Sequence, residues 1–172
     1  MSKLELDKIK LTNRLLVFDE IPLPGEKVDN KFKLLIGGLL YISNMSRPDI
    51  SIHVSKLSRF LDQSYVSVWK VAVDVLRYLV GTKELVLHLG KLDDTNLTVY
   101  VDSSFGDNGT RKAQTGTLIQ LNGSSIGWIS KRQKTTSKSS TEAEYVAHGT
   151  TLDDVLWTQN HINELNYPSN FP

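Results

Sequence analysis

The sequence predicts an α/β protein in which a helical segment is followed by antiparallel strands and one long helix. Between Asn30 and Leu79, apolar residues recur every three or four positions, which is typical of helices with one buried face. After Gly81, apolar residues alternate with polar ones, which indicates half-buried strands. A helical pattern returns at Ser140 and continues to about Leu165.

Three helices are predicted between residues 30 and 83. The second begins at Pro48 or Asp49, because proline is tolerated in the first turn of a helix. Gly81 ends the third helix. Gly37 and Gly38 in the first helix indicate close packing against a neighbouring element. The expected core positions are Phe32, Leu35, Ile36, Leu39, Leu40, Ile52, Leu57, Phe60, Leu61, Val68, Ala72, Val75, Leu76 and Leu79.

The region after Gly81 predicts two pairs of strands. The alternating leucines of residues 85–89 pair through a polar turn with residues 97–101. Residues 115–121 pair with residues 124–130 through Asn122-Gly123, the strongest hairpin signal in the chain.

The long C-terminal helix has leucines at helical spacing. Leu152, Leu156 and Leu165 are therefore its expected core positions. A weak point is expected at Gly149-Thr150-Thr151, because glycine lowers helix propensity.

Composition narrows the class of protein. A chain of 172 residues with 40% hydrophobic residues can bury the core of one domain or of two small ones. It has no cysteine, which rules out disulfides and thiolate zinc sites. No apolar run has the length of a signal peptide or of a membrane span, so we expect an intracellular protein, cytoplasmic or nuclear, with no membrane partner.

Two carboxylates mark the candidate site. Asp102 follows the alternating run at residues 97–101, so it should lie where a buried strand ends. Glu144 stands near the start of the long helix. A strand carboxylate and a helix carboxylate, separated by a hairpin, form one arrangement of a metal-dependent nuclease site. Asp102 can equally be an ordinary cap or turn residue.

The start of the long helix allows two capping boxes. Thr141 and Glu144 have the required spacing, and so do Ser139 and Glu142. Only the second pair leaves Glu144 free to face the strand.

The stretch between Asn108 and Thr141 contains six basic residues and no acidic residue. Such a stretch is often a solvated face. Beside Asp102 it can also hold the phosphates of a nucleic acid without reading sequence. The candidate nucleic-acid-binding residues are Arg111, Lys112, Lys131, Arg132, Lys134 and Lys138.

Two groups of sequence blocks stand in a fixed order. The first group lies at residues 34–41 (LLIGGLLY), 47–50 (RPDI) and 75–83 (VLRYLVGTK). The second lies at residues 102–107 (DSSFGD), 111–112 (RK), 125–128 (SIGW), 130–133 (SKRQ) and 139–145 (SSTEAEY), with Gly116 among them. This order resembles the Pol polyproteins of Ty1/copia-type retrotransposons.

The resemblance divides the chain into three parts. Residues 1–29 form an unassigned N-terminal arm. Residues 30–83 resemble the helical thumb and connection region of the reverse transcriptase. Residues 84–172 resemble the N-terminal part of the ribonuclease H domain, which implies three antiparallel strands followed by one long helix.

The resemblance also implies roles for the two carboxylates. Asp102 matches the first metal-binding aspartate of the ribonuclease H family, and Glu144 matches its helix glutamate. In the family, two further carboxylates complete a site for two Mg²⁺ ions, which activate water at a phosphodiester. They lie on a fourth strand and a later helix, which we do not find before Pro172. We therefore expect a truncated domain with half of a magnesium site.

A missing fourth strand leaves an edge of the first strand unpaired. We expect the N-terminal arm around residues 15–18, a second copy of the chain, or a protein partner to cover that edge. The predicted function is a retrotransposon-derived, catalytically incomplete ribonuclease H-like fragment that binds protein or nucleic acid. The alternative is a Mg²⁺-dependent ribonuclease H that cuts the RNA of RNA/DNA hybrids, with its site completed by dimerisation or a partner.

Overall fold

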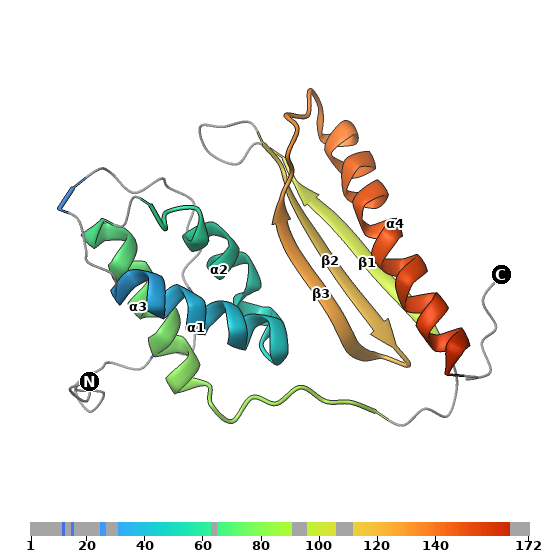
Figure 1. Ribbon diagram of the computed structural model, residues 1–172, viewed down its shortest axis with the longest axis horizontal. Coiled ribbons are helices and arrows are strands. Elements are labelled where there is room, and N and C mark those ends of the chain that lie inside the picture. Colours follow the sequence, from blue (N-terminus) through green and yellow to red (C-terminus); the bar gives the residue numbers. More distant parts are fainter. Residues whose placement is uncertain are drawn as a thin grey trace. The chain divides into compact units, whose positions relative to one another are not determined.

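The computed structural model describes Thr12, Leu15 and residues 25–26, 31–62, 65–90, 96–105 and 112–165. The chain divides into two compact units, Met1–Val86 and Leu87–Pro172. We refer to them as the helical unit, which contains helices α1 to α3, and the sheet unit, which contains strands β1 to β3 and helix α4 (Figure 1). The predicted α/β class is confirmed. The functional assignments of the three predicted segments stay predictions.

The helical unit contains the three predicted helices. They are α1 (Lys31–Met45), α2 (Ser51–Ser58) and α3 (Val66–Gly81), and a single 3₁₀ turn at Pro48–Ile50 leads into α2. The helices enclose one apolar core, because each turns its apolar stripe inwards. Its fully buried members are Phe32, Ile36, Leu39, Ile50, Val54, Leu57, Val68, Ala72 and Val75.

The paired glycines of α1 do not pack closely against a neighbour. Gly37 and Gly38 are exposed, and among the described residues no atom lies within 4 Å of the position that a Cβ would take at either of them. The buried stripe of α1 follows Phe32, Ile36 and Leu39, and the glycines fall on the other side of the helix. The prediction of close packing there is therefore wrong.

The sheet unit holds three antiparallel strands in the order β1-β2-β3. They are β1 (Leu97–Ser104), β2 (Gln114–Leu121) and β3 (Ser124–Arg132). The predicted Asn122-Gly123 hairpin joins β2 to β3, and both turn residues have positive φ, 51° and 76°, as a tight two-residue hairpin requires. One edge of β1 has no partner strand in the described part of the chain.

The predicted strand at residues 85–89 is wrong. Residues 85–90, all described, form no regular structure, and Leu85 and Leu89 are exposed. The strand that was expected to pair with them, β1, pairs with β2 instead, from Leu97 opposite Leu121 to Ser104 opposite Gln114. Alternating leucines provide the pattern of a strand, but a strand also needs an edge with which to pair.

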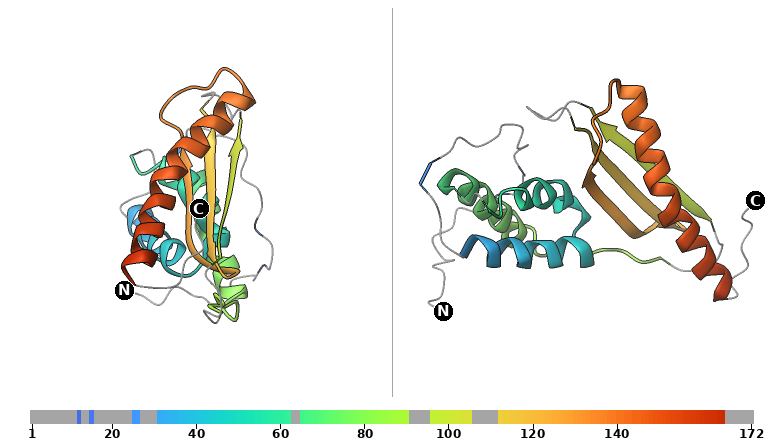
Figure 2. Two further views of the ribbon diagram at one scale, coloured as in Figure 1. Left: turned by 90° about the vertical axis from the view of Figure 1, so that its right-hand side faces the viewer. Right: turned by 45° about the horizontal axis from the view of Figure 1, so that its top comes forward.

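Helix α4 (Ser140–Glu164) continues without a break through Gly149 and covers one face of the sheet over β1 and β2 (Figure 2). Its buried positions are Ala143, Ala147, Thr151, Thr158 and Ile162. None of the helices that the structure describes has the length and apolar content needed to cross a lipid bilayer.

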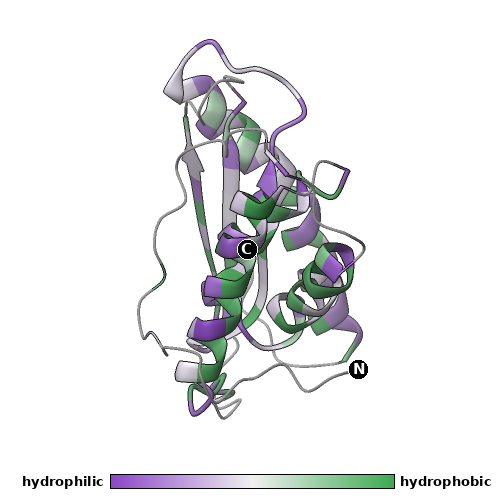
Figure 3. Ribbon diagram, turned by 90° about the vertical axis from the view of Figure 1, so that its left-hand side faces the viewer, coloured by the Kyte–Doolittle hydropathy of each residue, from purple (hydrophilic) through white to green (hydrophobic). Residues whose placement is uncertain are grey.

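The prediction that three leucines of the C-terminal helix are core positions is wrong. Leu152, Leu156 and Leu165 are 55%, 48% and 68% exposed. The face of α4 that lies on the sheet is made mainly of alanine and threonine, which allow the helix to come close to the strands, and the leucines fall on other sides. Figure 3 shows hydrophobic residues (green) between hydrophilic ones (purple) along the helices of the helical unit.

Candidate functional site

Helix α4 brings Glu144 to the end of β1. The Oε1 atom of Glu144 accepts a hydrogen bond of 3.3 Å from the backbone N–H of Ser103. This N–H belongs to the peptide unit that joins Asp102 to Ser103. The structure therefore places the Glu144 carboxylate beside the strand position of Asp102.

The start of α4 selects one of the two capping boxes. Ser139 is the N-cap, and its side chain accepts a hydrogen bond of 3.1 Å from the N–H of Glu142. The Glu142 carboxylate in turn accepts one of 2.6 Å from the N–H of Lys138. Ser139 thus satisfies an amide in the first turn of the helix, and Glu142 satisfies the Lys138 amide just before the N-cap, which leaves Glu144 free to face β1.

The direction of the Ser103 backbone N–H identifies the unpaired edge of β1. In an antiparallel strand, the N–H and C=O of alternate residues point to the same neighbour. The Ser103 amide is bonded to Glu144, so the amides and carbonyls of Val101 and Val99 also point away from β2. Glu144 therefore lies at the edge where β1 has no partner strand among the described residues.

Asp102 projects from the other face of the sheet. Its neighbour Val101 pairs with Thr117, and the Thr117 hydroxyl lies 2.7 Å from that of Thr151 on α4. Val101 therefore faces α4, and Asp102, the next residue along the strand, faces away and is exposed. The two carboxylates approach the same peptide unit from different sides.

The donor set suits Mg²⁺ in kind. Carboxylate oxygens are the protein ligands that Mg²⁺ prefers, usually one or two of them with water and substrate phosphate. Within the described residues, no group of three or more histidine, cysteine, aspartate or glutamate side chains lies close enough together to hold a metal. The Ser103 Oγ, on the α4 side of β1, is buried and has no hydrogen-bond partner in the same part of the chain. Asp102 and Glu144 alone could supply two ligands.

Only part of the predicted basic group lies together. Lys131, Arg132 and Lys134 line a pocket of about 460 Å³ between the sheet and α4. Lys112 and Lys138 are not among its lining residues. Arg111 lies outside the described residues.

Gln133 is an organising residue that sequence reasoning missed. It is 5% exposed, and its Nε2 donates to the Thr115 hydroxyl (3.1 Å) and to the Ala143 carbonyl (2.8 Å). Its Oε1 accepts a hydrogen bond of 3.1 Å from the Ser137 hydroxyl. The side chain thereby ties β2, the loop after β3 and α4 together. A glutamine inside a basic stretch gives no sequence signal for this role.

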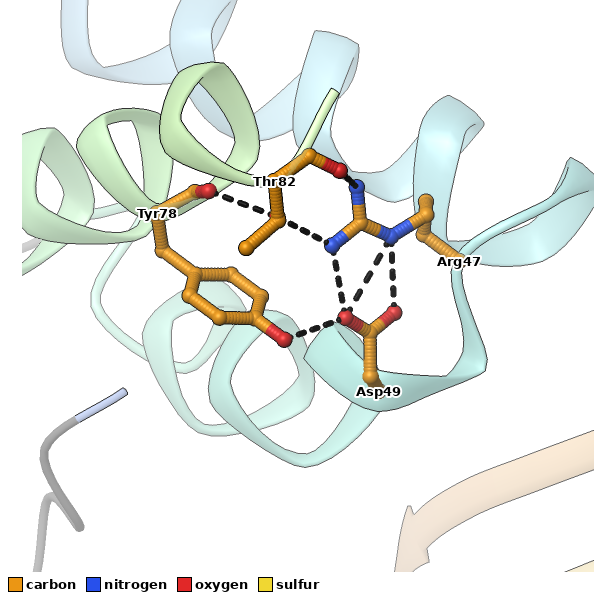
Figure 4. A network of polar contacts seen from close by, with 4 residues as sticks. All are labelled: Arg47, Asp49, Tyr78 and Thr82. Atoms are coloured by element: carbon orange, nitrogen blue, oxygen red, sulfur yellow. Dashed lines mark hydrogen bonds and ion pairs between the residues drawn. The ribbon is translucent and has the colours of Figure 1, made fainter. Parts of the chain in front are cut away.

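A second polar network lies in the helical unit, around Arg47 (Figure 4). Arg47 donates to the Asp49 carboxylate and to the carbonyl and hydroxyl oxygens of Thr82, and Tyr78 donates a hydrogen bond of 2.8 Å to Asp49. Burial raises the pKa of the Asp49 carboxyl, but the hydrogen bonds from Arg47 and Tyr78 outweigh it, so the pKa lies below its ordinary value. Hydrogen bonding to Asp49 raises the pKa of Arg47. These residues are satisfied by one another, so we assign them to stability.

The candidate N-terminal cover for the β1 edge is described only at one residue. Leu15 packs against the core of the helical unit. Residues 16–18, the rest of that predicted cover, lie outside the described residues.

Comparison with known proteins finds relatives of several kinds. The chain is 38% identical over 142 residues to a retrovirus-related Pol polyprotein from transposon TNT 1-94 of Nicotiana tabacum, a match that covers 82% of this chain and 11% of the polyprotein. It is 32% identical over 143 residues to a Pol polyprotein from transposon RE2 of Arabidopsis thaliana, covering 83% of this chain and 10% of that protein. It is 33% identical over 123 residues to secreted RxLR effector protein 161 of Plasmopara viticola, covering 71% of this chain and 87% of the effector. No family model and no solved structure matches.

Proposed function

Because the chain belongs to the family of Ty1/copia-type retrotransposon Pol polyproteins, we propose that its sheet unit is a ribonuclease H-like binding module that does not cut nucleic acid by itself. The observation that carries this proposal is the hydrogen bond from the Ser103 N–H to Glu144 at the unpaired edge of β1. The chain spans 11% of the tobacco polyprotein, so the activities of the whole polyprotein are proposals for this chain.

The geometry at β1 supports a ribonuclease H-like arrangement. Three antiparallel strands are followed by a helix whose second turn delivers a carboxylate to the end of the first strand. Asp102, at that strand end, supplies a second hard oxygen ligand. When bound, Mg²⁺ would activate water and stabilise the leaving oxygen of a phosphodiester. Asp102 and Glu144 would hold it.

The number of ligands favours binding over cleavage. Two Mg²⁺ ions between an attacking and a leaving oxygen need more carboxylates than the two that stand at this end of β1. We propose that further ligands come from outside the described residues or from another chain. Without them, the unit binds its ligand and leaves it intact.

Two observations favour two kinds of ligand. The cations Lys131, Arg132 and Lys134 around one pocket favour a nucleic acid, which is bound through its phosphates. The unpaired backbone groups of Val99 and Val101 favour a protein strand, added by a partner or by a second copy of the chain. The concentration of positive charge leads us to place nucleic acid first.

The second candidate function is cleavage. In this alternative the chain is a Mg²⁺-dependent ribonuclease H, and dimerisation or a partner supplies the other ligands. The position of Glu144 beside Asp102 favours it, because both carboxylates already stand at one end of β1.

A hydrolysis assay separates the two functions. The full chain, Asp102→Asn and Glu144→Gln are incubated with an RNA/DNA hybrid and Mg²⁺, and hybrid binding is measured in parallel at several salt concentrations. We expect salt-dependent binding without cleavage in all three proteins. Metal-dependent cleavage by the full chain that both substitutions abolish would establish the ribonuclease. Absence of hybrid binding at low salt would leave the protein partner as the remaining ligand.

A further inference from the structure

The pocket of about 460 Å³ in the sheet unit has walls from β2, β3, the loop after β3 and α4. Its size is within the range of small-molecule sites in proteins, about 300 to 1,000 Å³. The pocket lies on the α4 side of the sheet, because Thr115 and Thr117, which line it, are on that side. It is separate from Asp102, which faces away from α4.

The charge around the pocket is mainly positive. Lys131, Arg132 and Lys134 line it, and Asp154 is the one acidic residue among its lining residues. Lys131 and Lys134 are exposed, so both ammonium groups can move to an anion without being taken out of a buried pair. Two exposed lysines against one carboxylate among the lining residues favour a ligand with negative charge.

The pocket also offers a hydroxyl donor. The Thr115 Oγ1 accepts a hydrogen bond from Gln133, which leaves the hydroxyl hydrogen of Thr115 available to another acceptor. Ile129 and Val146 supply apolar surface beside these polar groups. A phosphate oxygen takes both kinds of contact, from a hydroxyl and from an ammonium group.

Gln133 holds the cationic wall in place. Its side chain is bonded to Thr115, Ser137 and the Ala143 carbonyl, and its N–H donates to the Ala113 carbonyl (2.8 Å). The loop that carries Lys134 is therefore anchored on one side to β2 and on the other to α4. A pre-formed site loses less entropy on binding than a flexible one.

We propose that this pocket binds a phosphate group, and that the phosphate belongs to the backbone of a nucleic acid. The source of the phosphate rests on the proposed nucleic-acid binding. The geometry divides the basic residues into a pocket pair, Lys131 and Lys134, and an outside pair, Lys112 and Lys138. Only the pocket pair contacts the bound phosphate.

Matched double variants test this division. Lys131→Gln with Lys134→Gln and Lys112→Gln with Lys138→Gln remove the same charge. Binding of a fluorescent RNA/DNA hybrid is followed by anisotropy over a range of salt concentrations. We expect the variant that lacks the pocket pair to bind the hybrid about tenfold more weakly at low salt, and the magnitude of its slope of log K against log salt to be smaller by about 2. The affinity of the variant that lacks the outside pair should stay within about twofold of the affinity of the unchanged chain.

A bulky side chain that fills the pocket tests the location of the phosphate site without a change in charge. Thr150 lines the pocket and Thr141 does not, and both are exposed on α4. Thr150→Phe should weaken hybrid binding about tenfold, and Thr141→Phe should leave it unchanged. Circular dichroism and urea unfolding check that both variants fold.

Further measurements distinguish the possible sources of the phosphate, and they distinguish failure of the pocket proposal from failure of the proposed function. Amide shifts of Thr150 and Thr151 are followed by NMR with the hybrid, with GMP and with inorganic phosphate. Amide shifts on addition of the hybrid support the proposal. Amide shifts with GMP or inorganic phosphate, but none with the hybrid, would show that the phosphate does not come from a nucleic acid. If the chain binds the hybrid but substitution of either lysine pair weakens binding equally, the assignment of the phosphate site to the pocket is wrong and the proposed function stands. If the chain binds no hybrid, both are wrong.

Discussion

Arg47 donates hydrogen bonds to both oxygens of Thr82, 3.1 Å to the carbonyl and 2.7 Å to the hydroxyl, across 35 residues of sequence. Thr82 is the C-cap of α3, so a guanidinium stands where the last carbonyls of the helix lack partners. Arg47 also pairs with Asp49 just before α2. One side chain thus joins the start of α2 to the end of α3.

Removal of the Arg47 guanidinium should destabilise the helical unit. Arg47 is 8% exposed, and Arg47→Met removes the guanidinium that donates to Asp49 and to the Thr82 carbonyl, so that Asp49 retains the Tyr78 hydroxyl as a donor. We expect a loss of about 2 kcal/mol in the free energy of unfolding, measured in urea. Arg77→Met is the matched control, because the side chains of the Arg77–Asp74 pair are 39% and 46% exposed and the pair should contribute less than about 0.5 kcal/mol. Equal losses in the two variants would contradict the role of Arg47.

The same network predicts a dependence on pH. The pKa of Asp49 is lower in the folded chain than its ordinary value of 3.8, so the unfolded chain takes up the proton first as the pH falls. The stability from Asp49 is therefore present above pH 3.8 and is lost as the pH falls through the lower, folded pKa. The difference in unfolding free energy between the unchanged chain and Asp49→Asn should shrink from pH 5 downwards. A constant difference over that range would refute the assignment.

The hydroxyl pair between β2 and α4 should show coupling. Thr117 and Thr151 are buried, and their hydroxyl oxygens lie 2.7 Å apart. Thr151→Val alone leaves the Thr117 hydroxyl buried without this partner, which should cost about 1 to 2 kcal/mol. Thr117→Val with Thr151→Val should cost less than the sum of the single changes. Strictly additive losses in urea unfolding would show that the two hydroxyls act independently.

Gln133 should stabilise the loop after β3. Gln133→Met removes three side-chain hydrogen bonds, and we expect a loss of about 2 kcal/mol together with faster amide hydrogen exchange in the loop. Gln120→Met is a suitable control, because Gln120 makes one half-buried hydrogen bond, to Ser125. A loop whose exchange is unchanged in Gln133→Met would contradict the anchoring role.

The sequence predicts those parts of the fold that depend on local signals. The buried stripe of α1 and the Asn122-Gly123 hairpin were confirmed, because spacing and turn chemistry act within a few residues. Leu152 and Leu156 were misplaced, because both sides of α4 carry apolar residues and the sheet selects the side with small ones. The strand at residues 85–89 failed for a related reason, since pairing is decided by distant segments.

The candidate site was predictable only in part. Asp102 and Glu144 stand at element ends that the sequence pattern locates, and the structure brings them to one peptide unit. Their role as metal ligands stays a prediction. Thr115 and Gln133 could not be found in this way, because ordinary polar residues acquire a role only when the fold brings them together.

The unpaired edge of β1 has a consequence for solubility. Free backbone groups at the edge of a sheet favour joining to another chain, and natural proteins block such edges with charged side chains. Glu144 occupies one free amide of this edge and places a negative charge there. We expect this charge to disfavour edge-to-edge aggregation. That effect requires neither a bound metal nor cleavage of a phosphodiester.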